Sequence, residues 1–327
     1  MNLRNGILLG VLAVQAILLV VVFWPEVAVA DPVQLFEGLE RDDIIQVILR
    51  DSTGRRIELA RGPDGCTLPD ADGYPCKLDE MLSLMDKLAA LKTENLVSQT
   101  AASHRRLGVA DDEFERLIEF GLSDGTSHRL LLGTSPRLRS VHVRAGGRNE
   151  VYLASGISSS DAEVVAASWT DTRYLTIPRD DVVAIGLGNA QGRFDLKRGD
   201  SGEWAINGLG DGETVDQGAV NAVLSRVTAL SMRRPLGKRE MDSYGIGDPG
   251  AVVTVETRDA DANEGTYTLW VGAEIGEDEF AAKSSESEYF VVLPGFSAGD
   301  LVEKTRDDLV NPPPTPTPPA TSTPDTP

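Results

Sequence analysis

The chain has 327 residues, enough for two ordinary domains, and its 41% apolar and 25% charged side chains are typical of a protein that buries a core. The formal net charge is −20 at pH 7. Nucleic acids and anionic membrane surfaces both bind basic faces, so this charge argues against both as partners.

The N-terminal segment Gly6 to Trp24 carries no charge and one polar side chain, Gln15. At 1.5 Å per residue, such a helix spans roughly the 30 Å hydrocarbon core of a bilayer. Arg4 precedes the segment and acidic residues follow it, so the positive-inside rule predicts a cytoplasmic tip and an extracytoplasmic body. We therefore expect residues 1–30 to form a short cytoplasmic N-terminus and a single-pass membrane anchor.

A cleaved signal peptide is the alternative interpretation of this segment. Pro25 would break the helix, and Ala28-Val29-Ala30 has the small-x-small form of a cleavage site. Cleavage after Ala30 would make the protein secreted, whereas without it the protein is a cell-membrane protein. Both interpretations export the bulk of the chain.

A self-match follows, because RDDIIQVILRDSTG (Arg41 to Gly54) returns as RDDVVAIGLGNAQG (Arg179 to Gly192). A self-match at long spacing is typical of a duplicated unit. We predict a first unit over residues 34–175 and a second unit over residues 176–310.

In the first unit, the apolar runs 44–49 and 57–59 predict a β-hairpin. Asp79 is the expected N-cap of a helix that carries an apolar stripe. The stripe is Met81, Leu84, Met85, Leu88 and Leu91. Further strands are expected at 117–122, 130–132, 141–143 and 151–153, and Asp124-Gly125 suits a type I′ turn between the first two.

The second unit repeats this order of elements. Strands are expected at 182–187, 194–196, 252–255, 267–271 and 289–292. Asp216 is the expected N-cap of the second helix. Its apolar stripe, Val220, Val223, Leu224, Val227 and Leu230, matches the first stripe position for position. Residues 311–327 are rich in Pro and Thr with no large apolar side chain, so we expect a disordered tail.

The two cysteines, Cys66 and Cys76, lie in one loop region and would form a local disulfide in an oxidising compartment. Cys66 falls close to the position that Trp204 fills in the second unit. We therefore expect the disulfide to substitute locally for a packed aromatic side chain.

No residue pattern points to catalysis or to a bound cofactor. Asp259, Asp261 and Asn263 resemble the start of an EF-hand loop, but Glu264 replaces its glycine and Trp270 its final glutamate, which leaves a weak Ca²⁺ candidate. Gly186-x-Gly188 precedes a strand and is interpreted as a turn. The three histidines lack metal-ligand spacing, so we interpret them as surface residues.

Together these elements resemble the domain-of-unknown-function family 4340, across residues 34–310. The resemblance is carried by the short basic N-terminus with its transmembrane segment and by the Asp-Asp pairs at 42–43 and 180–181, each of which begins a strand. It is also carried by Leu107-Gly108-Val109, which corresponds to Tyr244-Gly245-Ile246, and by the strands that end at Gly133 and Gly272. Leu107 stands where a Tyr is usual in the family, and Cys66 where a Trp is usual. The family implies no activity and no catalytic residue; its members often occur beside ABC-type transport components.

The sequence thus predicts an α+β fold: an N-terminal transmembrane helix, then two similar β-rich units, each with one long helix on a mainly antiparallel sheet. We expect a non-enzymatic, membrane-anchored extracytoplasmic accessory or scaffold protein. Its expected partners are ABC-type transporter subunits or other envelope proteins. The alternatives are an extracytoplasmic module that binds a ligand or Ca²⁺, and an envelope hydrolase of unknown specificity.

Overall fold

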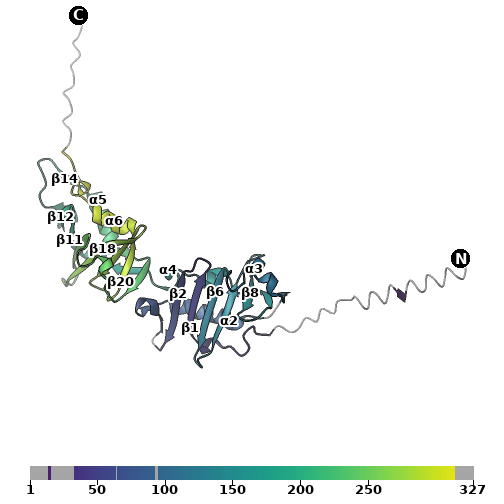
Figure 1. Cartoon of the computed structure of the whole chain (residues 1–327). Helices are drawn as coiled ribbons and strands as arrows, with labels where there is room; N and C mark the ends of the chain where they lie inside the picture. Colours follow the sequence, from purple (N-terminus) through teal and green to yellow (C-terminus); the bar gives the residue numbers. More distant parts are fainter. Residues whose placement is uncertain (1–13, 16–32, 64, 93–94, 314–327) are drawn as a thin grey trace, which may run out of the picture.

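A computed structural model of the chain describes residues 14–15, 33–63, 65–92 and 95–313. The predicted anchor, except for residues 14 and 15, the cleavage site at Ala30 and the tail beyond residue 313 lie outside these ranges. Within them, no helix is both long and apolar enough to cross a bilayer. The described chain forms an α+β fold with two large antiparallel sheets and a few short helices (Figure 1).

In the first sheet the described strands run in the order β4-β3-β2-β1-β6-β7-β8-β9-β5, and every neighbouring pair is antiparallel. Their bounds are β1 Ile44–Asp51, β2 Arg56–Gly62, β3 Gly65–Leu68, β4 Tyr74–Pro75, β5 Leu96–Ser98, β6 Arg116–Leu122, β7 Ser127–Leu132, β8 Ser140–Ala145 and β9 Val151–Ser155. We call this sheet with its helices the first unit.

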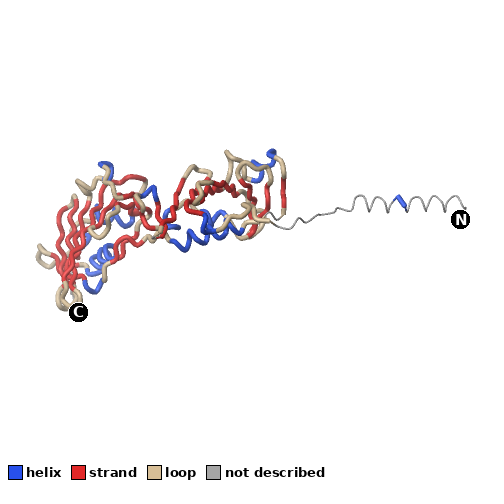
Figure 2. The backbone as a smooth tube through the Cα atoms, turned by 90° about the horizontal axis from the view of Figure 1, so that it is seen from below, coloured by secondary structure: helices blue, strands red, loops and turns tan. Residues whose placement is uncertain are grey.

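The second sheet has the order β13-β12-β11-β17-β18-β19-β20-β16, again antiparallel throughout its described strands. Their bounds are β11 Val182–Asn189, β12 Gly192–Arg198, β13 Trp204–Ile206, β16 Arg234–Gly237, β17 Ala251–Arg258, β18 Glu264–Gly276, β19 Glu279–Ser284 and β20 Phe290–Pro294. This sheet with its helices is the second unit, and the two units lie end to end (Figures 1 and 2).

The two sheets share details that the self-match alone does not specify. Each Arg-Asp-Asp stretch forms a 3₁₀ turn, η1 (Arg41–Asp43) and η5 (Arg179–Asp181), before the central strand. The strand pairing then shifts at the same place, between Ile44 and Gln46 in β1 and between Val182 and Ala184 in β11. The register therefore matches as well as the strand order.

One long helix packs on each sheet. Helix α2 (Leu78–Ala90) and helix α5 (Gln217–Thr228) each bury four of the five predicted stripe residues against the sheet. The fifth is buried too but lies outside its helix, because Leu91 follows α2 and Leu230 belongs to strand β15 (Ala229–Ser231). The Asp216 carboxylate accepts a hydrogen bond from the Ala219 amide (2.9 Å), so this N-cap is confirmed. The Asp79 N-cap is wrong: α2 begins at Leu78, which places Asp79 in the first helical turn, where its charge favours the positive helix end.

The remaining helices are short. They are α3 (His104–Leu107), α4 (Ala166–Trp169) and α6 (Gly295–Glu303), with the 3₁₀ turns η2 (Pro69–Ala71), η3 (Ala101–Ser103), η4 (Ser159–Ala162), η6 (Asp242–Tyr244) and η7 (Asp307–Leu309). The Asp124-Gly125 turn is not type I′, because only Gly125 has a positive φ (87°), whereas type I′ needs two such residues.

Strand β10 (Arg173–Thr176) pairs with β15 (Ala229–Ser231), beside α5, and β14 (Thr214–Val215) pairs with β21 (Val310–Asn311). Tyr174 and Leu175 accordingly pack in the second core. The boundary predicted between residues 175 and 176 cuts this strand, because the apolar side chains on both sides of it enter one core.

Steric contacts explain why residues 133 and 272 are glycines. A Cβ at Gly133 would overlap the carbonyl oxygen of Leu107, and a Cβ at Gly272 would overlap that of Tyr244. The Leu-Gly-Val and Tyr-Gly-Ile turns therefore lie directly against the strand ends. Two motifs that are distant in sequence form a single contact in each unit.

Candidate functional site

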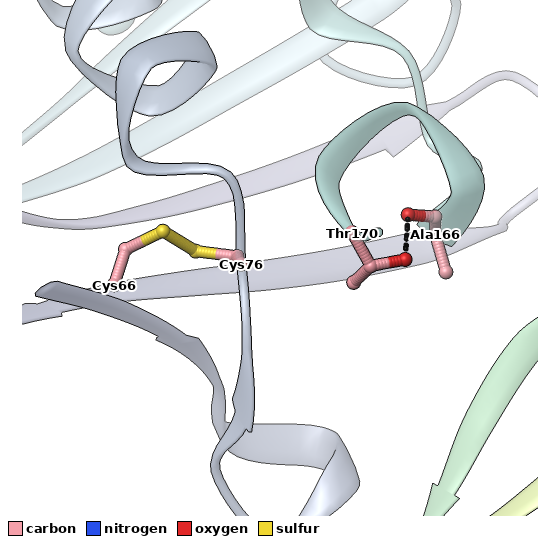
Figure 3. Close-up of a disulfide and its surroundings, with 4 residues drawn as sticks. All are labelled: Cys66, Cys76, Ala166 and Thr170. Carbon is pink, nitrogen blue, oxygen red and sulfur yellow. Dashed lines mark hydrogen bonds between the residues drawn. A yellow bond between two sulfur atoms is a disulfide. The ribbon is translucent and has the colours of Figure 1, made fainter. Parts of the chain in front are cut away.

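Cys66 and Cys76 are joined by a disulfide that closes the loop between β3 and α2, with their Cα atoms 5.2 Å apart (Figure 3). Cys66 lies opposite Arg61, and Trp204 lies opposite Arg198, the corresponding residue of the second unit. The sulfur and the indole thus occupy the same position of the two sheets. In Figure 3 the disulfide lies near α4, where the Thr170 hydroxyl donates to the Ala166 carbonyl (2.9 Å).

The loop that this disulfide closes contacts the second unit. The Asp72 carboxylate accepts a hydrogen bond from the Lys238 amide (2.7 Å) and a longer one from the Arg239 amide (3.4 Å). The next residue, Gly73, accepts a hydrogen bond at its carbonyl from the Tyr289 hydroxyl (3.2 Å). We call this contact the joint.

Aromatic side chains complete the joint. The Tyr74 and Tyr289 rings meet edge to face with centroids 4.8 Å apart, a favourable arrangement of aromatic pairs. The Lys238 ammonium lies 4.9 Å from the Tyr289 ring centroid, within cation–π range. A side chain at Gly237 (φ 101°) would overlap the Asp72 carboxylate, so the close approach requires glycine there.

Tyr174 holds Tyr289 from the inside of the second unit. Its hydroxyl donates to the Tyr289 carbonyl (2.8 Å) and accepts from the Ser284 amide (2.8 Å). Burial raises the pKa of Tyr174 to about 12, so the hydroxyl keeps the proton that it donates. The second-unit side of the joint is therefore fixed to a buried phenol.

The segment that links the units carries an ion pair beside the joint. Hydrogen bonds from the Arg173 side chain and backbone lower the pKa of Asp171 to about 2. Burial raises the pKa of Tyr74, and the Asp171 charge adds to that rise. The Asp171 charge thus lies close enough to Tyr74 to raise its pKa, and Tyr74 stays neutral at physiological pH.

The weak metal candidates do not form a cation site in this arrangement. Asp259 accepts hydrogen bonds from the Asp261 amide (2.9 Å), the Asn263 amide (2.9 Å) and the Asn263 side chain (2.8 Å). These bonds lower the pKa of Asp259. The carboxylate thus holds its own hairpin loop between β17 and β18, and no group of three or more His, Cys, Asp or Glu among the described residues could hold a metal ion.

The surface interpretation of the histidines is wrong for two of the three. His104 and His142 are each 7% exposed. One ring nitrogen of His104 lies 3.0 Å from the Asn149 carbonyl, and Nδ1 of His142 shares a hydrogen bond with the Thr134 hydroxyl (2.9 Å). Burial lowers the pKa of His142. Both pack where α3 meets the sheet, a contact that local sequence does not reveal.

Two open hollows lie next to each other on the described surface. One, of about 390 Å³, is lined by Glu37, Asp43, Ser123 and His128 among others, and its neighbour of about 460 Å³ shares Glu37 and His128. The His128 ring contacts Phe36 and Phe120, with centroids 5.1 and 5.4 Å away.

Sequence reasoning missed a pair of ion pairs that repeat between the units. Lys87 on α2 contacts Asp161 (2.6 Å), and Arg226 on α5 contacts Asp300. The two bases occupy corresponding helix positions, and each acid lies five residues after a glycine, Gly156 or Gly295. The recurring Gly-x-x-x-x-Asp spacing is the signal that could have found them.

Two antiparallel sheets in series, fixed by a disulfide-closed loop, define a two-unit α+β protein. A family model described as a domain of unknown function (DUF4340) matches residues 67–233, just over half of the chain. The chain belongs to this family. The match is narrower than the resemblance over residues 34–310, and it runs from β3 of the first unit to the region after α5 of the second. No curated protein and no solved structure matches the chain.

Proposed function

We propose that this chain is a non-enzymatic accessory protein that is anchored by residues 1–30 and holds two repeats of one unit outside the membrane. Its partner in this proposal is a component of an ABC-type envelope transport system. The joint is the observation that supports this role best. A disulfide, the Asp72 hydrogen bonds and the Tyr74–Tyr289 contact fix the two units into one elongated body, which suits a protein that presents a fixed surface.

Phe296 at the start of α6 supplies a candidate contact for the partner. Phe296 directly follows the glycine that lies five residues before the ion-paired aspartate of the second unit, and Ile157 holds the same place in the first unit. Phe296 is 72% exposed, whereas Ile157 is 2% exposed. An exposed aromatic side chain where the sister unit buries an aliphatic one is a feature of interaction surfaces, in which aromatic residues are enriched.

The test is site-specific photocrosslinking of the full chain in its native membranes. A photoreactive residue replaces Phe296 in one variant and Leu209, which is also exposed on the second unit, in a matched control. We expect an adduct with a transporter permease from position 296 and none from position 209. Equal adducts from both positions, or permease-free membranes that give the same adduct, would contradict the proposal.

The calcium-binding alternative gains no support from the geometry, because the Asp259 carboxylate already bonds to its own loop. Melting with and without millimolar Ca²⁺ tests it directly. An unchanged melting temperature removes this alternative, because a ligand that binds the folded state must raise that temperature.

A further inference from the structure

The loop between β7 and β8 carries a basic and apolar tip, Arg137-Leu138-Arg139, which we call the tip. Leu138 is 92% exposed, and both arginines are exposed too. Their side chains form no ion pair with another described residue. In a chain of net charge −20, two unpaired guanidinium groups around a solvent-exposed leucine form a local exception to the acidic surface.

The second unit has an acidic turn at the equivalent place. Leu132 of β7 pairs with Val143, and Val271 of β18 pairs with Ala282, so the connections that follow Gly133 and Gly272 correspond. In the second unit this connection holds Glu277 and Asp278, and Asp278 contacts Arg233 (3.5 Å). The shared fold therefore does not require a basic tip, which is a property of the first unit alone.

The base of the loop is held against α3. The Thr134 amide donates to the Leu107 carbonyl (2.9 Å), and the His142 amide donates to the Thr134 carbonyl (3.1 Å). Arg106 on α3 is exposed, has no ion pair with a described residue, and lies close enough to His142 to lower its pKa in addition to burial. Arg106 is thus a third arginine without an ion pair, at the corner of the first unit where the base of this loop meets α3.

This corner lies at the end of the first unit that faces away from the second unit. Figure 1 places α3 at this end, and the described chain begins at the opposite end of β7 from the tip, where Phe36 contacts His128 (ring centroids 5.1 Å apart). Eight residues, 25–32, separate Trp24 from the first residue of the continuous described chain, Val33. At ~3.3–3.6 Å per residue they reach at most about 29 Å. A bilayer that holds the apolar segment therefore lies within about 29 Å of Val33.

We propose that the tip rests on the anionic lipid surface of the membrane that anchors the chain, an inference that depends on the anchoring part of the proposed function. The guanidinium groups of Arg137 and Arg139 contact lipid phosphates, which match their forked donors, and Leu138 enters the headgroup boundary. Charges beyond about 8 Å are screened at physiological ionic strength, so the acidic body does not cancel the attraction. The basic end turns toward the bilayer and the second unit points away.

The experiment uses the full chain in nanodiscs and an NBD label at position 138. The sequence has two cysteines, both in the disulfide, so Leu138→Cys gives the only free thiol. Glu277→Cys labels the equivalent turn of the second unit and is the matched control. We expect the label at 138, but not at 277, to shift to the blue and to be quenched by spin-labelled lipids in phosphatidylglycerol discs. In phosphatidylcholine discs both labels should stay in water.

Added charge changes test the electrostatic part. Each arginine near an anionic surface contributes ~1 kcal/mol, which is about a fivefold change in the docked fraction relative to the free one. Arg137→Gln and Arg139→Gln together should therefore lower that ratio about 25-fold, and raised salt should lower it without any substitution. A label at 138 that stays as exposed as the label at 277, or that docks equally on both lipids, overturns the proposal.

Failure of the anchor is distinguishable from failure of the tip. A chain released from the discs refutes the anchoring, yet its label at 138 still reports on added phosphatidylglycerol vesicles. If that label remains in water on the vesicles too, the tip proposal is refuted independently of the anchor.

Discussion

Removal of the Cys66–Cys76 disulfide should loosen the joint as well as the first unit. The two cysteines are 10 residues apart in sequence. In the loop-entropy description, a cross-link of this span stabilises the folded state by about 2.7 kcal/mol. For a protein of this size, 1 kcal/mol shifts the melting temperature by ~2–4 °C, so Cys66→Ala with Cys76→Ala should lower it by ~5–11 °C.

Amide hydrogen exchange separates the joint from ordinary destabilisation. The Gly73 amide donates to the Leu68 carbonyl inside the loop (3.0 Å), and the Lys238 amide donates across the joint to Asp72 (2.7 Å). Without the disulfide, both amides should exchange faster, although Lys238 belongs to the second unit. Local opening of this kind is what exchange rates measure.

Trp204→Ala is the matched control, because Trp204 fills the position of Cys66 in the second unit. Truncation of a buried Trp costs ~3–5 kcal/mol, so the second unit should melt earlier while the Gly73 amide keeps its protection. If the double cysteine variant melts early but leaves the exchange of Lys238 unchanged, the disulfide stabilises only its own unit. That result would refute the role of the loop as the joint.

Three further predictions concern the fold. Gly272→Ala should lower the free energy of unfolding by ~3 kcal/mol in thermal melting, because its Cβ would overlap the Tyr244 carbonyl. Gly247→Ala is the control and should change that free energy little, because open space surrounds Gly247. Equal losses in the two variants would refute the steric explanation. Asp216→Ala should cost ~1 kcal/mol in denaturant unfolding through loss of the α5 cap, and a neutral result would contradict that cap. Burial raises the pKa of Asp51, but hydrogen bonds from neighbouring groups outweigh it and hold the folded pKa below 3.8. The stability that Asp51 supplies is therefore present above pH 3.8 and is lost as the pH falls through the lower folded pKa. Asp51→Asn should weaken this loss of stability in acid, measured by unfolding at pH 2–5. A variant with the same pH profile as the original chain would contradict the prediction.

Local patterns predicted much of the fold. The apolar stripe of α2 and that of α5 emerged from helical spacing, and the strands emerged from short β-branched runs between turn residues. The self-match predicted that these elements would recur in one order. Such signals lie within a few residues of one another, so the sequence carries them without help from the rest of the molecule.

Some predictions failed where a neighbour distant in sequence decided the outcome. Strand β10 joined the second core because β15, more than fifty residues later, offers it a partner. His104 and His142 are buried because α3 packs against the sheet, not because of their immediate neighbours. The turn at Asp124-Gly125 failed for a local reason instead, because the Asp124 carboxylate accepts a hydrogen bond from the Thr126 amide (2.8 Å).

The sequence by itself determined the elements, their repetition and the position shared by Cys66 and Trp204. Only the tertiary structure decided the joint, because Asp72 and Lys238 are 166 residues apart and neither carries a local pattern that names the other. The same holds for the tip: its exposure and its unpaired arginines depend on what the fold leaves beside it. Periodicity encodes which face of an element is buried, whereas contacts between elements depend on the packing of the whole chain.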